Sequence, residues 1–166
     1  MAINVILNHT DTAIAGVTTL ALARGLTNFK ADFCIKQDEP GEAIITNKTS
    51  PIDCPEKFRF ASSAVKDIYQ NTDVDPSTRS ASRRGTRILC QLSDVYTLTD
   101  STDATYLVNL PIEGHIVLTL PNDSNITEAM LLAFIGRLVS GLFETGSTDA
   151  SRLKSQLRGA MLPVDM

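Results

Sequence analysis

Cationic and hydrogen-bonding side chains alternate with apolar ones along three stretches in the middle and second half of the chain. In a β-strand, alternate residues point to the same face, so each stretch would gather its polar members on one side. The combined polar set is Lys57, Arg59, Ser63, Arg87, Gln91, Ser93, His115 and Thr119. Cations bind phosphates, and the other groups bind base edges and riboses. The pattern fits an RNA-binding sheet face, but for an antiparallel sheet taken by itself an ordinary solvated face is the more common explanation.

The opposite face of the same strands is predicted to be apolar and covered by helices. Its members are Phe58, Phe60, Ile88, Cys90, Leu92, Ile116, Leu118 and Leu120. Glu113 lies close to the polar set and would repel phosphate. We therefore expect Glu113 to pair with Arg59 or Arg87.

Enzyme chemistry has little support in the sequence. The chain has two histidines, His9 and His115, and it lacks a nucleophile elbow, a P-loop, a zinc-protease motif and a dinucleotide fingerprint. A dyad of His115 with Asp94 or Ser93 on adjacent strands is the remaining catalytic candidate, and nothing in the pattern demands it. We predict a protein that is not an enzyme, with no catalytic residue, no cofactor and no metal.

The three cysteines are Cys34, Cys54 and Cys90, an odd number without C-x-x-C spacing. This argues against a zinc site or a redox motif. Two interpretations stay open: reduced, mostly buried thiols, or one disulfide between subunits that forms after release from a reducing cytoplasm.

The length of 166 residues favours one domain spanning residues 1–166. No signal peptide is visible, and the most apolar segment is interrupted by Gly136, Arg137 and Ser140, so no membrane partner is expected. The net charge of −4 argues against a generic nucleic-acid binder. Residues 57–87, however, carry seven cations and three acids, a local excess of +4.

The order of predicted elements is a run of antiparallel strands followed by two helices, an α+β arrangement. An N-terminal β-hairpin is expected from strands 2–7 and 17–23, and Pro40-Gly41 marks a turn. Pro111 is expected at a bend, and Pro121 ends the last strand. The further strands are expected at 31–36, 43–47, 57–68, 86–96, 106–110 and 115–120, with loops at 71–85 and 97–105.

The first predicted helix carries Met130, Phe134, Leu138 and Leu142 on one i, i+4 row. Asn125 with Glu128 resembles a capping box, and Gly141 or Gly146 would end the helix. We expect this row to pack on a sheet and on a second chain; the alternative is a core helix within one chain.

A second short helix is expected after a cap at Ser147 or Thr148, and Pro163 would end it. It would place Leu153, Leu157 and Met161 on one face. Arg152, Lys154 and Arg158 near its other side are expected to be solvated or to contact another subunit.

The chain resembles the coat proteins of single-stranded-RNA bacteriophages, the leviviruses. The motifs that carry the resemblance are Pro55–Ala61 (PEKFRFA), Val108–Pro111 (VNLP), Leu118–Pro121 (LTLP), and Arg152-Leu153 with Leu157–Ala160 (LRGA). The order of elements matches over nearly the full length. The chain is longer than the best-known members, chiefly at 24–42 and 71–85.

The resemblance implies an intertwined homodimer, in which two sheets join through the 116–120 strand and each long helix packs across the partner's sheet. The interface residues would be Ile116, Leu118, Met130, Phe134, Leu138 and Leu142. Dimers would build an icosahedral shell around the single-stranded RNA genome, with the loop at 97–105 gathered around the symmetry axes.

The resemblance also implies that the uncovered sheet face binds RNA, including an operator stem-loop whose capture represses translation. The expected location is the virion, assembled in the cytoplasm of a bacterial host. The alternative is a sheet-based RNA-binding regulator that does not assemble. Arg79, Arg83 and Arg84 would either contact packaged RNA through counterion release or pair with Asp73 and Asp75 in a solvated loop.

Overall fold

The computed structural model describes residues 8–18, 20, 25–102, 105–160 and 162. The predicted strand at 2–7 lies outside them; of the predicted strand at 17–23, Val17, Thr18 and Leu20 are described, and none belongs to a strand. The backbone divides into two compact units, one of residues 27–122 and one of residues 1–26 with 123–166. The assignment of residues 1–166 to one domain stays a prediction.

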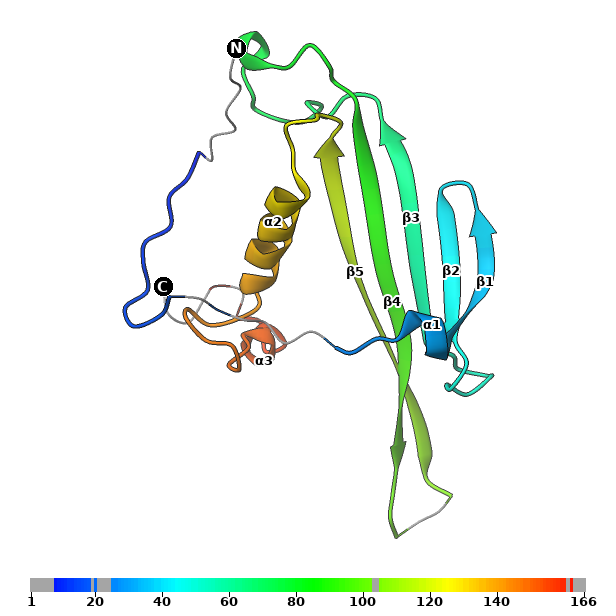
Figure 1. The fold of residues 1–166 in the computed structure, drawn as a ribbon. Coiled ribbons are helices and arrows are strands. Elements are labelled where there is room, and N and C mark those ends of the chain that lie inside the picture. The colour runs from blue at the N-terminus through cyan, green and yellow to red at the C-terminus, as the bar shows by residue number, and fades with distance from the viewer. Residues whose placement is uncertain (1–7, 19, 21–24, 103–104, 161, 163–166) are drawn as a thin grey trace. The chain divides into compact units, whose positions relative to one another are not determined.

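The first unit is an antiparallel sheet of five strands in the order β1-β2-β3-β4-β5, so each strand pairs with its neighbours along the chain (Figure 1). The fold class is confirmed: an antiparallel sheet is followed by helices. The strands are β1 Phe33–Glu39, β2 Glu42–Asn47, β3 Lys57–Val65, β4 Gly85–Thr99 and β5 Leu107–Pro121. The β1–β2 turn uses Pro40 and Gly41, as predicted, and Gly41 has a φ of 91°, a value that favours glycine.

A short helix, α1 (Phe29–Asp32), precedes the sheet and was not expected from the sequence. The Asn28 side chain caps it by accepting a hydrogen bond from the Ala31 amide at 3.1 Å. The helix brings Phe29 onto Phe33, Phe58 and Phe60, with ring centroids 5.3, 5.3 and 6.2 Å away. Phe33 is 8% exposed, and among the described residues it is the one hydrophobic residue that is buried. This aromatic cluster is therefore the core of the β1–β3 end of the sheet.

Strands β4 and β5 are longer than the rest of the sheet. Strand β3 pairs with β4 only as far as Ser93, and beyond it β4 and β5 continue as a two-stranded ribbon to Thr99 and Leu107 (Figure 1). The predicted bend at Pro111 is wrong, because Pro111 lies opposite Val95 inside one continuous β5. An edge strand tolerates the missing amide. The predicted loop at 97–105 is correspondingly shorter.

Residues 66–84 form an ordered loop with a 3-10 turn at Pro76–Thr78. The amide and hydroxyl of Ser77 donate to the Asp75 carboxylate and lower the pKa of that group. Arg79 donates from Nε and Nη2 to the Val74 carbonyl at 3.0 and 2.8 Å, and its guanidinium lies 5.5 Å from the Tyr69 ring centroid. The loop is thus held by its own contacts.

The second unit contains the helix α2, Glu128–Ser140. Its N-cap is Thr127, whose hydroxyl accepts from the Met130 amide at 3.4 Å. The predicted cap at Asn125 is wrong, because the amide and side chain of Asn125 both donate to Asp123 and close a turn before the helix. Gly141 is the C-cap, one of the two residues predicted, so Leu142 lies past the helix end.

The second predicted helix is much shorter than expected: α3 spans only Leu153–Gln156 and begins after Arg152. The hydroxyl of Ser147 accepts instead from the amides of Asp149 and Ala150 in the preceding turn. Met161 and the predicted end at Pro163 lie outside the described residues.

The described N-terminal segment belongs to the same unit as α2. Arg137 donates from Nη1 to both carboxylate oxygens of Asp11, at 2.7 and 2.8 Å. Gly146 has a φ of +74°, and a Cβ at this position would lie 3.2 Å from the Ile14 side chain. Among the described helices, none is long and apolar enough to cross a membrane.

The aromatic cluster generates a stability prediction. Phe33→Ala should lower the free energy of unfolding by about 3 kcal/mol, because it leaves a cavity beside the rings of Phe29 and Phe58. The measurement is urea unfolding of the full chain at fixed protein concentration, since any self-association would contribute to the apparent stability.

The control is Ile52→Ala, because Ile52 is 100% exposed. This variant should unfold within about 0.5 kcal/mol of the parent protein. Equal losses in both variants would show that the cluster is not a core.

Candidate nucleic-acid interface

The strand register brings all eight residues of the predicted polar set onto one face of the sheet. Directly opposite residues of antiparallel strands point to the same side. Three rows cross β3, β4 and β5 in this way: Lys57–Ser93–Glu113, Arg59–Gln91–His115 and Ser63–Arg87–Thr119. We call this surface the polar face. The predicted role of these residues in RNA binding stays a prediction.

Most of the polar face is open to solvent. Ser63, Arg87, His115 and Thr119 are exposed, whereas Lys57, Gln91 and Ser93 are half-buried. The Arg59 side chain is 44% exposed. A ligand could therefore reach both the cations and the hydrogen-bonding groups.

A chain of hydrogen bonds crosses the polar face from β2 to β5. Arg59 donates from Nε to Glu42 at 2.5 Å and from Nη1 to the Gln91 Oε1 atom at 3.4 Å. Gln91 donates from Nε2 to Glu113 at 2.5 Å. We call these four side chains, Glu42, Arg59, Gln91 and Glu113, the carboxylate-ended row.

In the carboxylate-ended row, Glu113 has a different partner from the one predicted. Glu113 was predicted to pair with Arg59 or Arg87, but it accepts from Gln91. Arg59 takes Glu42 instead, and Arg87 donates from Nε to the Thr119 hydroxyl at 3.3 Å. An amide thus stands between the guanidinium of Arg59 and the carboxylate of Glu113.

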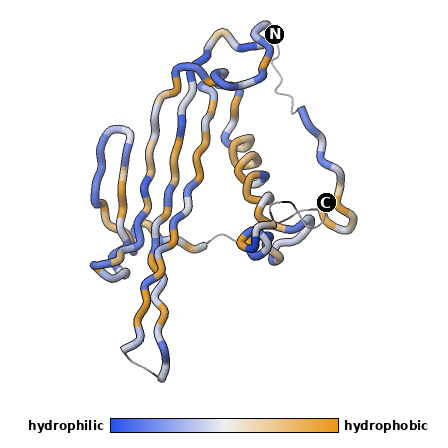
Figure 2. The backbone as a smooth tube through the Cα atoms, turned by 180° about the vertical axis from the view of Figure 1, so that it is seen from behind, coloured by the Kyte–Doolittle hydropathy of each residue, from blue (hydrophilic) through white to orange (hydrophobic). Residues whose placement is uncertain are grey.

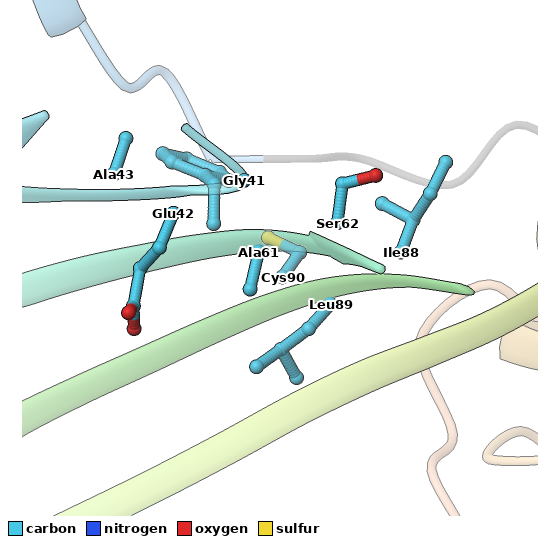
Figure 3. A pocket seen from close by; sticks show the side chains of 9 residues that line it. Gly41, Glu42, Ala43, Ala61, Ser62, Ile88, Leu89 and Cys90 are labelled. Atoms are coloured by element: carbon cyan, nitrogen blue, oxygen red, sulfur yellow. The ribbon is translucent and has the colours of Figure 1, made fainter. Parts of the chain in front are cut away.

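Glu42 is the residue of this face that the sequence reasoning missed, because its placement depends on the register between β2 and β3. Figure 3 shows the side chains of Glu42 and Leu89 on one side of the strands and those of Ala43, Ser62 and Ile88 on the other. On β2 to β5, the polar face carries Lys57, Arg59 and Arg87 against Glu42 and Glu113, which is three cations minus two carboxylates, or +1. Its positive excess is smaller than the sequence suggested.

The opposite, apolar face keeps a large exposed area. Apolar and polar residues alternate along the central strands in Figure 2. Ile88, Leu92 and Ile116 remain 41, 36 and 38% exposed. A shallow hollow of about 330 Å³ adjoins the β1–β2 turn and is lined in part by Phe60, Ile88 and Cys90 (Figure 3).

The strand register also bears on the catalytic candidate, a dyad of His115 with Asp94 or Ser93. Asp94 lies opposite Ile112, so it belongs to the apolar face and cannot reach His115 across the sheet. Ser93 shares the polar face but lies opposite Glu113, and within the described chain no hydrogen bond joins it to His115. No group of His, Cys, Asp or Glu among the described residues could hold a metal ion.

The arginines of the 66–84 loop have partners other than those predicted. Arg83 pairs with Asp67 at 3.5 Å rather than with Asp73 or Asp75, and Arg79 binds the Val74 carbonyl. Arg84 is exposed, and its carbonyl accepts from the Asn122 amide at 3.1 Å. Arg83 is therefore partly neutralised by a carboxylate, whereas Arg79 is held by a neutral carbonyl and keeps its charge.

The cysteines are free thiols in the single chain, and the expectation of mostly buried thiols is wrong for Cys34 and Cys90, which are exposed. Partial burial raises the pKa of the Cys90 thiol. Desolvation, followed by the nearby Asp53 carboxylate, raises the pKa of Cys54. Both groups therefore stay protonated at neutral pH, which slows disulfide exchange. A disulfide between subunits stays a prediction.

Solved structures with the same fold are proteins of bacteriophage particles. The virus-like particle of bacteriophage AVE015 matches with a TM-score of 0.83 and 26% identity, over 92% of this chain and 94% of that one. The virus-like particle of bacteriophage GQ-112 matches with a TM-score of 0.71 and 12% identity, over 92% and 97% of the two chains. No family model and no curated protein matches the chain.

The fold is thus that of phage capsid proteins. The resemblance to the coat proteins of single-stranded-RNA bacteriophages, carried in the sequence by short motifs and their order, is confirmed by these structures.

Proposed function

We propose that the protein is a structural capsid protein that forms homodimers, which assemble into an icosahedral shell around single-stranded genomic RNA. The observation that carries the proposal is the match to the AVE015 virus-like particle over nearly the full length of both chains. The protein would reside in the virion and assemble in the cytoplasm of its bacterial host.

The unpaired edge of β5 supports a dimer. Among the described strands, β5 pairs only with β4, so its 15 residues leave a row of backbone donors and acceptors without partners. Such an edge invites pairing with another chain. A second copy, joined through the part of β5 that holds Ile116 and Leu118, would satisfy these groups and extend the polar face across both subunits.

The apolar residues of α2 support the same conclusion. Phe134 and Leu138 are 56% and 50% exposed, and Leu142, just past the helix, is 40% exposed. Met130 on the same row is half-buried. Burying side chains of this size stabilises an interface by roughly 1.5–3 kcal/mol each before entropy is counted. A partner's sheet, with its exposed apolar face, offers a matching surface.

The polar face supports RNA as the ligand inside the shell. It combines Lys57, Arg59 and Arg87 with amide, hydroxyl and imidazole groups on one open surface. Phosphate contacts would supply affinity, and the neutral groups would contact the bases of an operator stem-loop, whose capture would repress translation. The second candidate function, an RNA-binding regulator that does not assemble, relies on the same face.

Electron microscopy of the expressed full chain tests the proposal directly. Closed shells of uniform size are expected. A monodisperse dimer that binds RNA would favour the non-assembling regulator, and a small monomer without RNA would overturn both.

The polar face generates a prediction about packaged RNA. Replacing both Arg59 and Arg87 by Ala removes two cations and leaves Glu42 without its partner. The double variant should package less RNA, measured as the ratio of absorbance at the nucleic-acid and protein maxima, while dimers persist. For single-stranded RNA, the salt dependence of binding should flatten by about 0.7 per cation removed.

The matched control removes two cations from the C-terminal region, Lys154→Ala with Arg158→Ala. Both residues are exposed and lie outside the sheet. This control should keep the RNA content of the parent. Unchanged packaging in the double variant of Arg59 and Arg87 would count against the polar face.

The helix row generates a prediction about the dimer. Phe134→Asp should raise the dimer dissociation constant at least about 100-fold, because it removes a large apolar contact and buries a charge. Sedimentation of the soluble protein measures this. The control is Leu132→Asp, because Leu132 is 61% exposed but lies off the row, on the opposite side of α2. A normal Phe134→Asp dimer would show that the row is not at the interface.

A further inference from the structure

We infer that Glu113 and Glu42 are specificity-determining positioning residues of the polar face: they orient Gln91 and Arg59 toward an unpaired base that carries an amino group, and they keep phosphate away from the centre of the face. The inference deepens the proposed function and rests on it. Its basis is the carboxylate-ended row, which spans four adjacent strands.

The row fixes the orientation of the Gln91 amide. The guanidinium of Arg59, a donor only, lies on the Oε1 side, and the carboxylate of Glu113, an acceptor only, lies on the Nε2 side. A flipped amide would place its NH2 group against the guanidinium and its oxygen against the carboxylate. Both contacts would be repulsive, so the charged neighbours select one orientation.

An oriented Gln91 amide keeps one free N–H and one free lone pair beside each other. A base edge offers the complementary donor and acceptor, whereas a phosphate offers acceptors only. Glu113 adds a second acceptor on the same side of the amide. Carboxylates accept from the amino group of cytosine and repel phosphate. The centre of the face therefore favours an amino-bearing base edge over the RNA backbone.

The cations that can hold the backbone lie beside this centre and not in it: Lys57 is two residues from Arg59 along β3, about 7 Å at the rise of a strand. Arg87 is four residues from Gln91 along β4, about 13 Å at the rise of a strand. Lys57 is two strands away from Glu113 in the same row. Neither has a carboxylate partner among the contacts of the described sheet. Backbone binding at the sides and base binding in the middle are thus divided between different residues.

Glu42 and Glu113 reduce the net positive charge of the polar face. A surface built only to hold RNA would gain from having neither carboxylate, since each one cancels a cation in counterion release. Through their hydrogen bonds they orient Arg59 and Gln91. The polar face thus loses some general affinity for RNA and gains discrimination between bases.

Two short RNAs of about 12 nucleotides, oligocytidylate and oligouridylate, are the probes. The two bases have the same size and differ along one edge: cytosine has an amino donor at position 4 and an acceptor at N3, and uracil has a carbonyl acceptor at position 4 and a donor at N3. Fluorescence anisotropy with the full-length protein would measure the affinity for each probe over a range of salt concentrations.

The parent protein should bind oligocytidylate at least fivefold more tightly than oligouridylate. Glu113→Gln should lose most of this preference, bind oligouridylate more tightly, and show a salt dependence steeper by about 0.7. Glu42→Gln should have the same effects in weaker form, because it acts on Gln91 through Arg59. Glu144→Gln changes the charge equally outside the sheet and should match the parent.

The outcomes separate the inference from the proposed function. If the parent binds both probes and the double variant of Arg59 and Arg87 weakens binding, but Glu113→Gln changes neither preference nor salt dependence, the inference is overturned and the RNA-binding face stands. If the parent binds neither probe, both fail. Should Glu113→Gln not fold, Gln91→Ala replaces it and should lose the same preference; an unchanged preference would overturn the inference.

Discussion

The pairing of β4 with β5 is the interaction on which the rest of the structure depends. It runs without interruption from Gly85 opposite Pro121 to Thr99 opposite Leu107. Because side chains alternate with a period of two, this one register decides the face of every residue on both strands. A shift by one residue would bring Gln91 and Arg87 to the apolar side and expose Ile88 and Cys90 beside the cations. Both faces therefore depend on one ladder.

The same pairing leaves apolar side chains that the single chain does not bury. A two-stranded ribbon is marginal in water, yet β4 and β5 continue as a ribbon past the end of β3. Within the described chain, one hydrophobic residue, Phe33, is buried, while Tyr96, Leu107 and Ile112 on the ribbon are 58, 62 and 48% exposed. A sheet with this much exposed apolar surface is stable where other copies cover it. In the proposed shell, contacts between copies would therefore supply part of the core that the single chain lacks.

The sequence predicted the two faces because alternation along β3, β4 and β5 needs only the local pattern, and a single register preserves it. It failed where a competing contact decides the outcome. Asn125 is a good cap by type, but its side chain turns back to Asp123, and the Thr127 hydroxyl accepts from the Met130 amide instead. Pro111 breaks most strands, but on an edge its missing amide costs nothing. Glu42 could not be placed, because its face depends on the β2–β3 register and not on its own strand.

The net charge of the whole chain does not predict the net charge of one binding face. A net charge of −4 coexists with a polar face of +1, since most acids lie on other segments and screening limits their reach to about 10 Å. What a ligand meets is decided locally, by which cations already have partners. Arg59 is paired with the Glu42 carboxylate, whereas Arg87 donates to the neutral hydroxyl of Thr119. Two arginines that look equivalent in the sequence thus differ in the charge each can offer, and the register alone makes the difference.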